Sequence, residues 1–293
     1  MALLTKIKAN LTIATRRRVP GLLEGQYAST VTGRSLDFSD LREYVIGDDV
    51  KDFDWKATAR HVTPLVKRYV ADRKRTVLLT VCAGAQMAGL ANVAETKAEV
   101  VIMAAGLMGY LGARHGDYVG LQVTGAGKIT VQRPSTREIE LERMLQIVQA
   151  RCAAGEPAGD LKALLEFIVA TVRRRSILVL VIDDVALDGP VEALLRRLAA
   201  QHEIFVIVVP DLDPTGEDPE ILHEVIDNAE IPAFVRNDPE LAAQLADADA
   251  ARREERARLF TGLGISHEVI GSTDDAIPAI FRLLGRTRHA IRG

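Results

Sequence analysis

The stretch Ser176–Ile182 reads SILVLVI, and six of its seven residues are apolar. Two other stretches have the same character: Thr76–Val81 reads TVLLTV, and Glu203–Val209 reads EIFVIVV. A strand that is apolar along its whole length is typical of a parallel sheet that helices cover on both faces. These three stretches therefore predict the centre of an α/β domain.

Helical patterns alternate with strands along the rest of the chain. Helices are predicted over Asn92–His115, Thr136–Cys152, Asp160–Arg174, Pro190–Gln201, Glu240–Leu263 and Asp275–Arg286, and further strands over Tyr118–Val123, Ile129–Gln132, Ile231–Val235 and Ser266–Ile270. This alternation predicts a doubly wound, mostly parallel, Rossmann-like sheet. Ligands of such sheets bind at the carboxyl ends of the strands, so the loops after Val81, Ile182 and Val209 are the first places to examine.

The first quarter of the chain has a different organisation. A helix is predicted over Met1–Val19, where Pro20 ends it, and a short helix is predicted to begin within Ser39–Tyr44. A strand is predicted over Leu65–Val70. We therefore divide the chain into an N-terminal helical and irregular extension, residues 1–75, and an α/β domain, residues 76–293.

Charge and composition limit the classes of function. The net charge is −3, yet residues 1–75 carry 15 Lys and Arg against 9 Asp and Glu. Nucleic-acid binding through the basic N-terminal helix is thus one alternative, although no aromatic residues are interleaved with the cations. The longest nearly apolar run, Val100–Leu111, is too short to cross a bilayer. Two cysteines in apolar surroundings, Cys82 and Cys152, fit a cytoplasmic protein.

The sequence contains no motif that indicates a catalytic centre or a cofactor. The segment Gly125–Lys128 reads GAGK, but the first glycine of a phosphate-binding loop is missing, so a hairpin turn is expected there. The six histidines are scattered along the chain. The enzymatic alternative is a hydrolase that uses Cys82 at a strand end, which would require a lowered thiol pKa and a neighbouring base.

Two adjacent carboxylates, Asp183 and Asp184, directly follow the strand SILVLVI. At the carboxyl end of a strand they can bind a hard cation through their oxygen atoms. They can equally cap the following helix or remain as separate solvated charges. The sequence leaves these three interpretations open.

The densest polar segment is Arg34–Arg60, which reads RSLDFSDLREYVIGDDVKDFDWKATAR. Trp55, the single tryptophan of the chain, is expected to anchor this segment on the sheet. The segment can be a loop held by internal salt bridges or a docking surface for a partner. The candidate interaction residues are Arg42, Tyr44, Asp48, Asp49, Asp54, Trp55 and Arg60.

The spaced string Leu41-Arg42-Glu43-Tyr44, Gly47-Asp48-Asp49, Asp54-Trp55 and Ala59-Arg60 resembles the signature of the domain-of-unknown-function family 58 (DUF 58). Lys51 and Phe53 replace the usual Arg and Ile. In that family the signature precedes a von Willebrand factor A-like domain. The resemblance implies a non-enzymatic adaptor or co-chaperone of a MoxR-type AAA ATPase, often accompanied by a membrane-anchored transglutaminase-like protein.

Von Willebrand factor A domains bind a divalent ion through three loops at the carboxyl ends of their strands. The resemblance places Cys82, Gly84 and Gln86 at the ligand positions of the first loop, Gly159 in the second and Asp184 in the third. Only Asp184 keeps a usual ligand, and hard cations prefer carboxylate and hydroxyl oxygens. We therefore expect a degenerate metal site that holds no ion.

Overall fold

The computed structural model describes residues 2–17, 27, 40–45, 53–60, 63–68, 74–125, 127–212 and 238–290. Asp48, Asp49 and the strand predicted over Ile231–Val235 lie outside these ranges. The side chain of Arg42 is also not described, although its backbone is.

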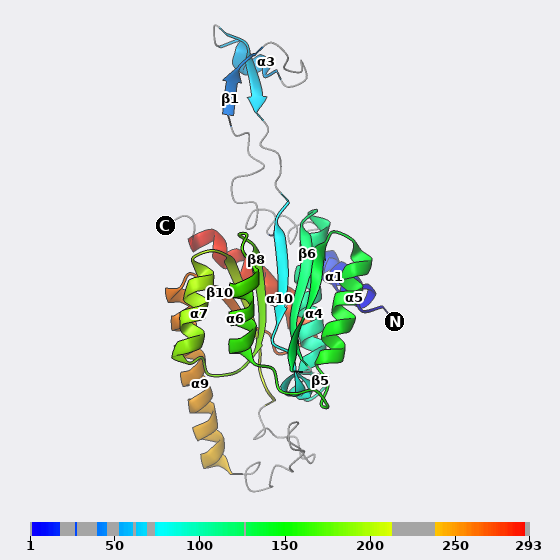
Figure 1. Ribbon diagram of the computed structural model, residues 1–293, viewed down its shortest axis with the longest axis vertical. Helices are drawn as coiled ribbons and strands as arrows, with labels where there is room; N and C mark the ends of the chain where they lie inside the picture. Colours follow the sequence, from blue (N-terminus) through cyan, green and yellow to red (C-terminus); the bar gives the residue numbers. More distant parts are fainter. Residues whose placement is uncertain are drawn as a thin grey trace.

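A six-stranded sheet forms the centre of the protein, in the order β10-β9-β8-β3-β6-β7 (Figure 1). The strands are β3 (Thr76–Val81), β6 (Tyr118–Gly125), β7 (Lys128–Ser135), β8 (Ile177–Asp183), β9 (Glu203–Val209) and β10 (Ser266–Val269). All neighbours pair in parallel except β7, which forms an antiparallel hairpin with β6. The predicted doubly wound, mostly parallel sheet is confirmed, and the GAGK segment is the hairpin turn.

Strand β3 lies where the direction of winding changes. The chain first passes from β3 to β6 on one side and later returns to β8 on the other side. Leu79 therefore has Leu121 and Val179 as its neighbours across the sheet. The carboxyl ends of β3, β8 and β9 meet at one edge, here called the carboxyl edge, as expected of a topological switch point.

Helices cover both faces of the sheet in two layers. One layer contains α1 (Leu3–Arg17), α4 (Lys97–Arg114), α5 (Glu138–Arg151) and α10 (Thr273–Ala290). The other contains α6 (Leu161–Thr171), α7 (Gly189–Ala199) and α9 (Pro239–Gly262). Because successive strand residues face opposite sides, Leu79 packs in the first layer and Leu78 in the second. In the described part of the chain, no helix combines the length and apolarity needed to cross a membrane.

Helix α4 is apolar all round and runs through the first layer. Its capping box joins Thr96 to Glu99, so the helix begins at Lys97. The predicted start at Asn92 is wrong, because β4 (Leu90–Asn92) and β5 (Glu95–Thr96) form a small antiparallel pair there, after the 3₁₀ turn η2 (Ala85–Ala88). Packing against α1 is close: a Cβ atom at Gly106 would lie 2.2 Å from Ile7 Cδ1.

The family signature folds locally into what we call the signature unit, the described residues within 40–68. Strand β1 (Asp40–Glu43) pairs antiparallel with β2 (Leu65–Arg68), and α3 (Trp55–Thr58) lies between them in sequence. The prediction of a short helix within Ser39–Tyr44 is wrong, because strand pairing satisfies that backbone instead. The expectation that Trp55 anchors the segment on the sheet is also wrong, since Trp55 is 66% exposed and stacks on Phe53.

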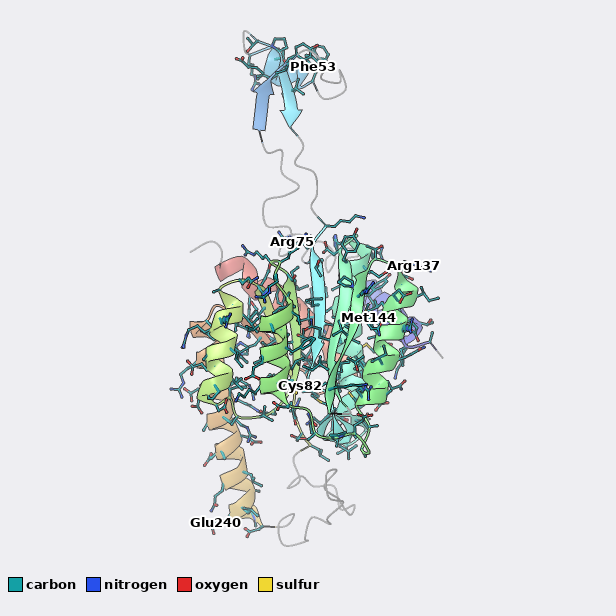
Figure 2. All side chains as sticks on the ribbon, viewed as in Figure 1. Phe53, Arg75, Cys82, Arg137, Met144 and Glu240 are labelled. Atoms are coloured by element: carbon teal, nitrogen blue, oxygen red, sulfur yellow. The ribbon has the colours of Figure 1, made fainter. Side chains whose placement is uncertain are left out.

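The signature unit joins the sheet at the edge opposite the carboxyl edge. Figure 2 shows Phe53 beyond the Arg75 end of β3 and Cys82 at its other end. At the Arg75 end, Asp117 accepts hydrogen bonds from the Arg75 amide and from the hydroxyl of the buried Tyr27. Helix α1 packs on α4 and α5, and the boundary proposed at residue 75 stays a prediction.

Candidate functional site

The adjacent carboxylates at the end of β8 point to opposite faces of the sheet, because alternate strand residues do so. Asp183 meets Lys97 at the start of α4, and Asp184 meets Arg256 of α9. Both cations are buried: Lys97 is 0% exposed and Arg256 is 4% exposed. The chain therefore supplies each carboxylate with a cation, and the two cations come from helices on opposite faces of the sheet.

Lys97 joins the ends of two neighbouring strands. Its Nζ atom contacts Asp183 and lies 2.7 Å from Oδ1 of Asp211, just beyond β9. Burial raises the pKa of Asp183, and the positive charge of Lys97 opposes that rise. The Asp184 amide also donates to Asp183. The ammonium thus ties the loops after β8 and β9 to the first turn of α4.

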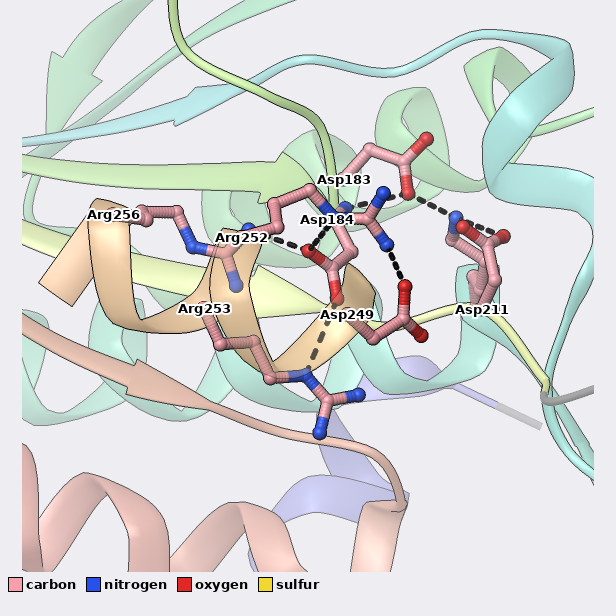
Figure 3. A network of polar contacts seen from close by, with 8 residues as sticks. Asp183, Asp184, Asp211, Asp249, Arg252, Arg253 and Arg256 are labelled. Carbon is pink, nitrogen blue, oxygen red and sulfur yellow. Dashed lines mark hydrogen bonds and ion pairs between the residues drawn. The ribbon is translucent and has the colours of Figure 1, made fainter. Parts of the chain in front are cut away.

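Asp184 lies among three arginines of α9 (Figure 3). Arg256 forms the buried ion pair, while Arg252 and Arg253 approach Asp184 at 3.4 and 3.7 Å. Arg252 also pairs with Asp249 one turn earlier on the same helix. This cluster fastens α9 to the carboxyl edge.

These contacts show Asp183 and Asp184 neither as a helix cap nor as separate solvated charges, because both pair with cations of the chain. Neither caps the following helix, because Asp188 accepts from the Val191 amide as the N-cap of α7. The sequence alone does not reveal Lys97 and Arg256 as the partners of these carboxylates. Lys97 could have been predicted as a partner, because it is a lysine at the start of an otherwise apolar helix. Arg256 could not, because in the sequence it resembles the exposed arginines beside it on α9.

The loops expected to carry the first two groups of metal ligands pack directly on each other. Gln86 Oε1 accepts a hydrogen bond of 2.9 Å from the Gly159 amide. A Cβ atom at Gly84 would lie 2.4 Å from the Gly159 nitrogen, and one at Gly159 would lie 2.1 Å from the Ala83 oxygen. Protein atoms therefore already fill the space that ligand side chains at Gly84 and Gly159 would need.

Cys82 lies under this loop packing and is only 4% exposed. Burial raises the pKa of its thiol to about 12, although a hydrogen bond with Thr124 opposes the rise. Thr124 itself donates to the Ala83 carbonyl oxygen at 2.6 Å. A thiol with this pKa is protonated at neutral pH, and a nucleophilic cysteine needs the thiolate.

The five aligned positions do not fit a divalent ion. Gly84 and Gly159 offer no side-chain oxygen, Cys82 offers a buried thiol, and the Gln86 oxygen is already used by a backbone amide. Asp184, the one carboxylate, is shared among arginines. Hard cations need several oxygen ligands at once. The described residues also contain no group of three or more His, Cys, Asp or Glu placed to hold a metal.

The signature unit presents a row of aromatic side chains. The Tyr44 and Phe53 rings are 5.2 Å apart, and the Phe53 and Trp55 rings are 5.1 Å apart. Tyr44 is 38% exposed and the neighbouring Val45 is 60% exposed. Asp54 caps α3 by accepting from two of its amides, so its role in this unit is structural. Arg60 is exposed beside α3.

The comparison with protein families agrees with this arrangement. The family described as "Protein of unknown function DUF58" matches residues 40–221, from β1 to beyond β9. The chain belongs to the DUF58 family. As a member of this family it carries the signature unit ahead of the sheet, which is the order that the sequence resemblance implied.

Similar proteins, each described as an uncharacterized protein, occur in mycobacteria. Proteins of Mycobacterium tuberculosis and Mycobacterium bovis are 29% identical over 291 residues, which cover 97% of this chain and 90% of theirs.

Among solved structures, the protein BatB of Bacteroides thetaiotaomicron is similar with a TM-score of 0.45 and 13% identity. The match covers 73% of this chain and 99% of BatB. A von Willebrand factor type A protein of Catenulispora acidiphila has a TM-score of 0.37 and 9% identity, over 76% and 43% of the two chains.

Proposed function

We propose that this DUF58 protein is a non-enzymatic protein-interaction module that serves a MoxR-type AAA ATPase as an adaptor or co-chaperone. The observation that carries the proposal is the exposed aromatic row of the signature unit. Aromatic side chains dominate the energetics of protein interfaces when a partner buries them. Trp55, at 66% exposure, offers a large apolar surface that the described residues leave uncovered.

The two candidate docking surfaces are the carboxyl edge and the signature unit. They differ in how far their charged and apolar groups already contact other groups of the chain. At the carboxyl edge, Asp183, Asp184 and Asp211 all pair with cations of the chain. In the signature unit, Tyr44, Val45 and Trp55 are exposed together. This difference favours the signature unit as the docking surface, with a degenerate metal site at the other edge that takes no part in recognition.

The alternatives receive less support. A hydrolase using Cys82 would need a thiolate, and the pKa of about 12 opposes its formation. Nucleic-acid binding through α1 is opposed by the net charge of −3, and one cation of the helix, Lys8, pairs with Glu138 of α5. A salt-dependent gel shift with DNA or RNA would support nucleic-acid binding.

We also propose a cytoplasmic location and, as a second partner, a membrane-anchored transglutaminase-like protein. The location is supported by the two free, buried cysteines, Cys82 and Cys152, which suit a reducing compartment. The second partner rests on the family resemblance alone.

Co-purification with the MoxR-type ATPase of the same organism tests the proposal. Charge reversal at Arg42, or at Asp48 together with Asp49, is expected to abolish co-purification. Arg133→Glu on β7 is a matched control, because Arg133 is exposed and distant in sequence from the signature unit. Unchanged co-purification of the signature variants would move the interface elsewhere, and failure of the wild-type protein to co-purify would reject the ATPase as partner.

A further inference from the structure

The carboxyl edge concentrates negative charge where three loops meet. Asp183 ends β8 and Asp211 follows β9, and these two strands are neighbours in the sheet. Two carboxylates that contact the same ammonium repel each other. Burial raises the cost of keeping Asp183 ionised, because its side chain is only 12% exposed, whereas that of Asp211 is 64% exposed. Asp183, the more buried member of the two, therefore requires a cation beside it.

A bound divalent ion is the usual means of satisfying such an edge, because hard cations prefer carboxylate oxygens. In this chain the Lys97 ammonium lies between the two carboxylates and is completely shielded from solvent. Burying an ammonium is costly unless it is paired and hydrogen-bonded. The two carboxylates therefore hold the Lys97 ammonium in place, and the ammonium in turn holds the two carboxylates in place.

We propose that the Lys97 ammonium is a built-in replacement for a bound cation at the carboxyl edge. It neutralises Asp183 and Asp211, joins α4 to the loops after β8 and β9, and excludes a divalent ion from their oxygens. Lys97 is thus a positioning residue that makes this edge independent of metal. The inference goes beyond the proposed function, since no partner protein enters it.

The charge balance of the surrounding network supports this role. In the described part of the chain, the ion-pair network around Asp183, Asp184 and Asp211 contains four carboxylates and four cations, and each carboxylate contacts at least one of the cations. These residues are Asp183, Asp184, Asp211, Asp249, Lys97, Arg252, Arg253 and Arg256. The charges of these eight described side chains sum to zero, so a divalent cation bound among them would add positive charge next to Lys97.

Removal of the ammonium should convert the edge into a cation site. In Lys97→Ala, Asp183 and Asp211 keep their oxygens but lose their cation, and the truncated side chain leaves room for an ion. We expect the melting temperature of this variant to fall in the presence of a chelator and to rise again with millimolar Mn²⁺. The wild-type melting temperature should be the same in both conditions. Lys97→Ala combined with Asp183→Asn should lose the response to Mn²⁺.

Two results would overturn the inference. One is a rise in the wild-type melting temperature with Mn²⁺ that disappears in Asp183→Asn, because an ion would then bind despite Lys97. The other is a folded Lys97→Ala protein that ignores Mn²⁺. If Lys97→Ala does not fold in chelator, recovery on refolding with Mn²⁺ supports the inference, and failure of both Lys97→Ala and the larger Lys97→Gln to respond contradicts it. None of these outcomes affects docking through the signature unit.

Discussion

Arg256 and Asp184 form an ion pair between α9 and the end of β8 in which each side chain is only 4% exposed. The pair joins residues 72 positions apart and fixes the long helix α9 to the carboxyl edge. Removing one partner of such a pair leaves a buried charge without compensation, which destabilises a protein strongly. The stability of the α9 layer should therefore depend on this contact.

Arg256→Met is expected to lower the free energy of unfolding by about 2 to 3 kcal/mol, measured by urea denaturation. This loss of unfolding free energy is small for the breaking of a buried ion pair, because Arg252 and Arg253 still attract Asp184. Arg253→Met is the matched control: its side chain is 51% exposed, so its loss should stay below about 1 kcal/mol. Equal losses in the two variants would show that burial of the pair is not what matters.

The contact between the first two loops makes a second prediction. Gly159→Ala should destabilise the protein by about 2 kcal/mol or more, because its Cβ would lie 2.1 Å from the Ala83 oxygen and the loops would have to separate. Gly189→Ala is the control, since a Cβ there meets nothing within 4 Å and alanine favours the helix. Unfolding curves of both variants provide the comparison. A Gly159→Ala protein as stable as wild type would refute the close loop packing.

Thiol chemistry supplies a prediction about pH. Burial raises the pKa of both Cys82 and Cys152 to about 12, so the native thiols stay protonated until the pH approaches that value. Native protein should therefore react slowly with a disulfide reagent at mildly alkaline pH, and urea-unfolded protein should react fast. Fast native labelling that persists in Cys152→Ser but is lost in Cys82→Ser would instead favour the hydrolase alternative.

The sheet could be predicted from sequence with good accuracy for a physical reason. Strands β3 and β9 have the predicted bounds, Thr76–Val81 and Glu203–Val209, because central strands buried on both faces are apolar throughout. The start of α4 could not be predicted as well, because distant contacts hold the β4–β5 pair that precedes it. The Asn92 side-chain amide donates to the Gly271 carbonyl oxygen, and Glu95 accepts from the Thr273 amide. Such contacts join residues that are nearly 180 positions apart.

The candidate site was predicted only in part. The sequence pointed to the loops after Val81, Ile182 and Val209, and their ends do meet at one edge. It did not reveal which cations would reach them, because a buried Arg256 and an exposed Arg253 look alike in a charged helix. The exposure of Trp55 could not be predicted for a similar reason: a single large aromatic side chain fits a buried anchor and an exposed contact equally well.

The affinity for the MoxR-type ATPase, compared between wild type, Trp55→Ala and Ile139→Ala, tests the central claim most directly. Ile139 on α5 is 64% exposed and is a matched apolar truncation away from the signature unit. We predict that Trp55→Ala raises Kd by about tenfold or more, which corresponds to about 1.4 kcal/mol, while Ile139→Ala leaves it unchanged. A Trp55→Ala protein that binds as tightly as wild type would contradict docking through the signature unit.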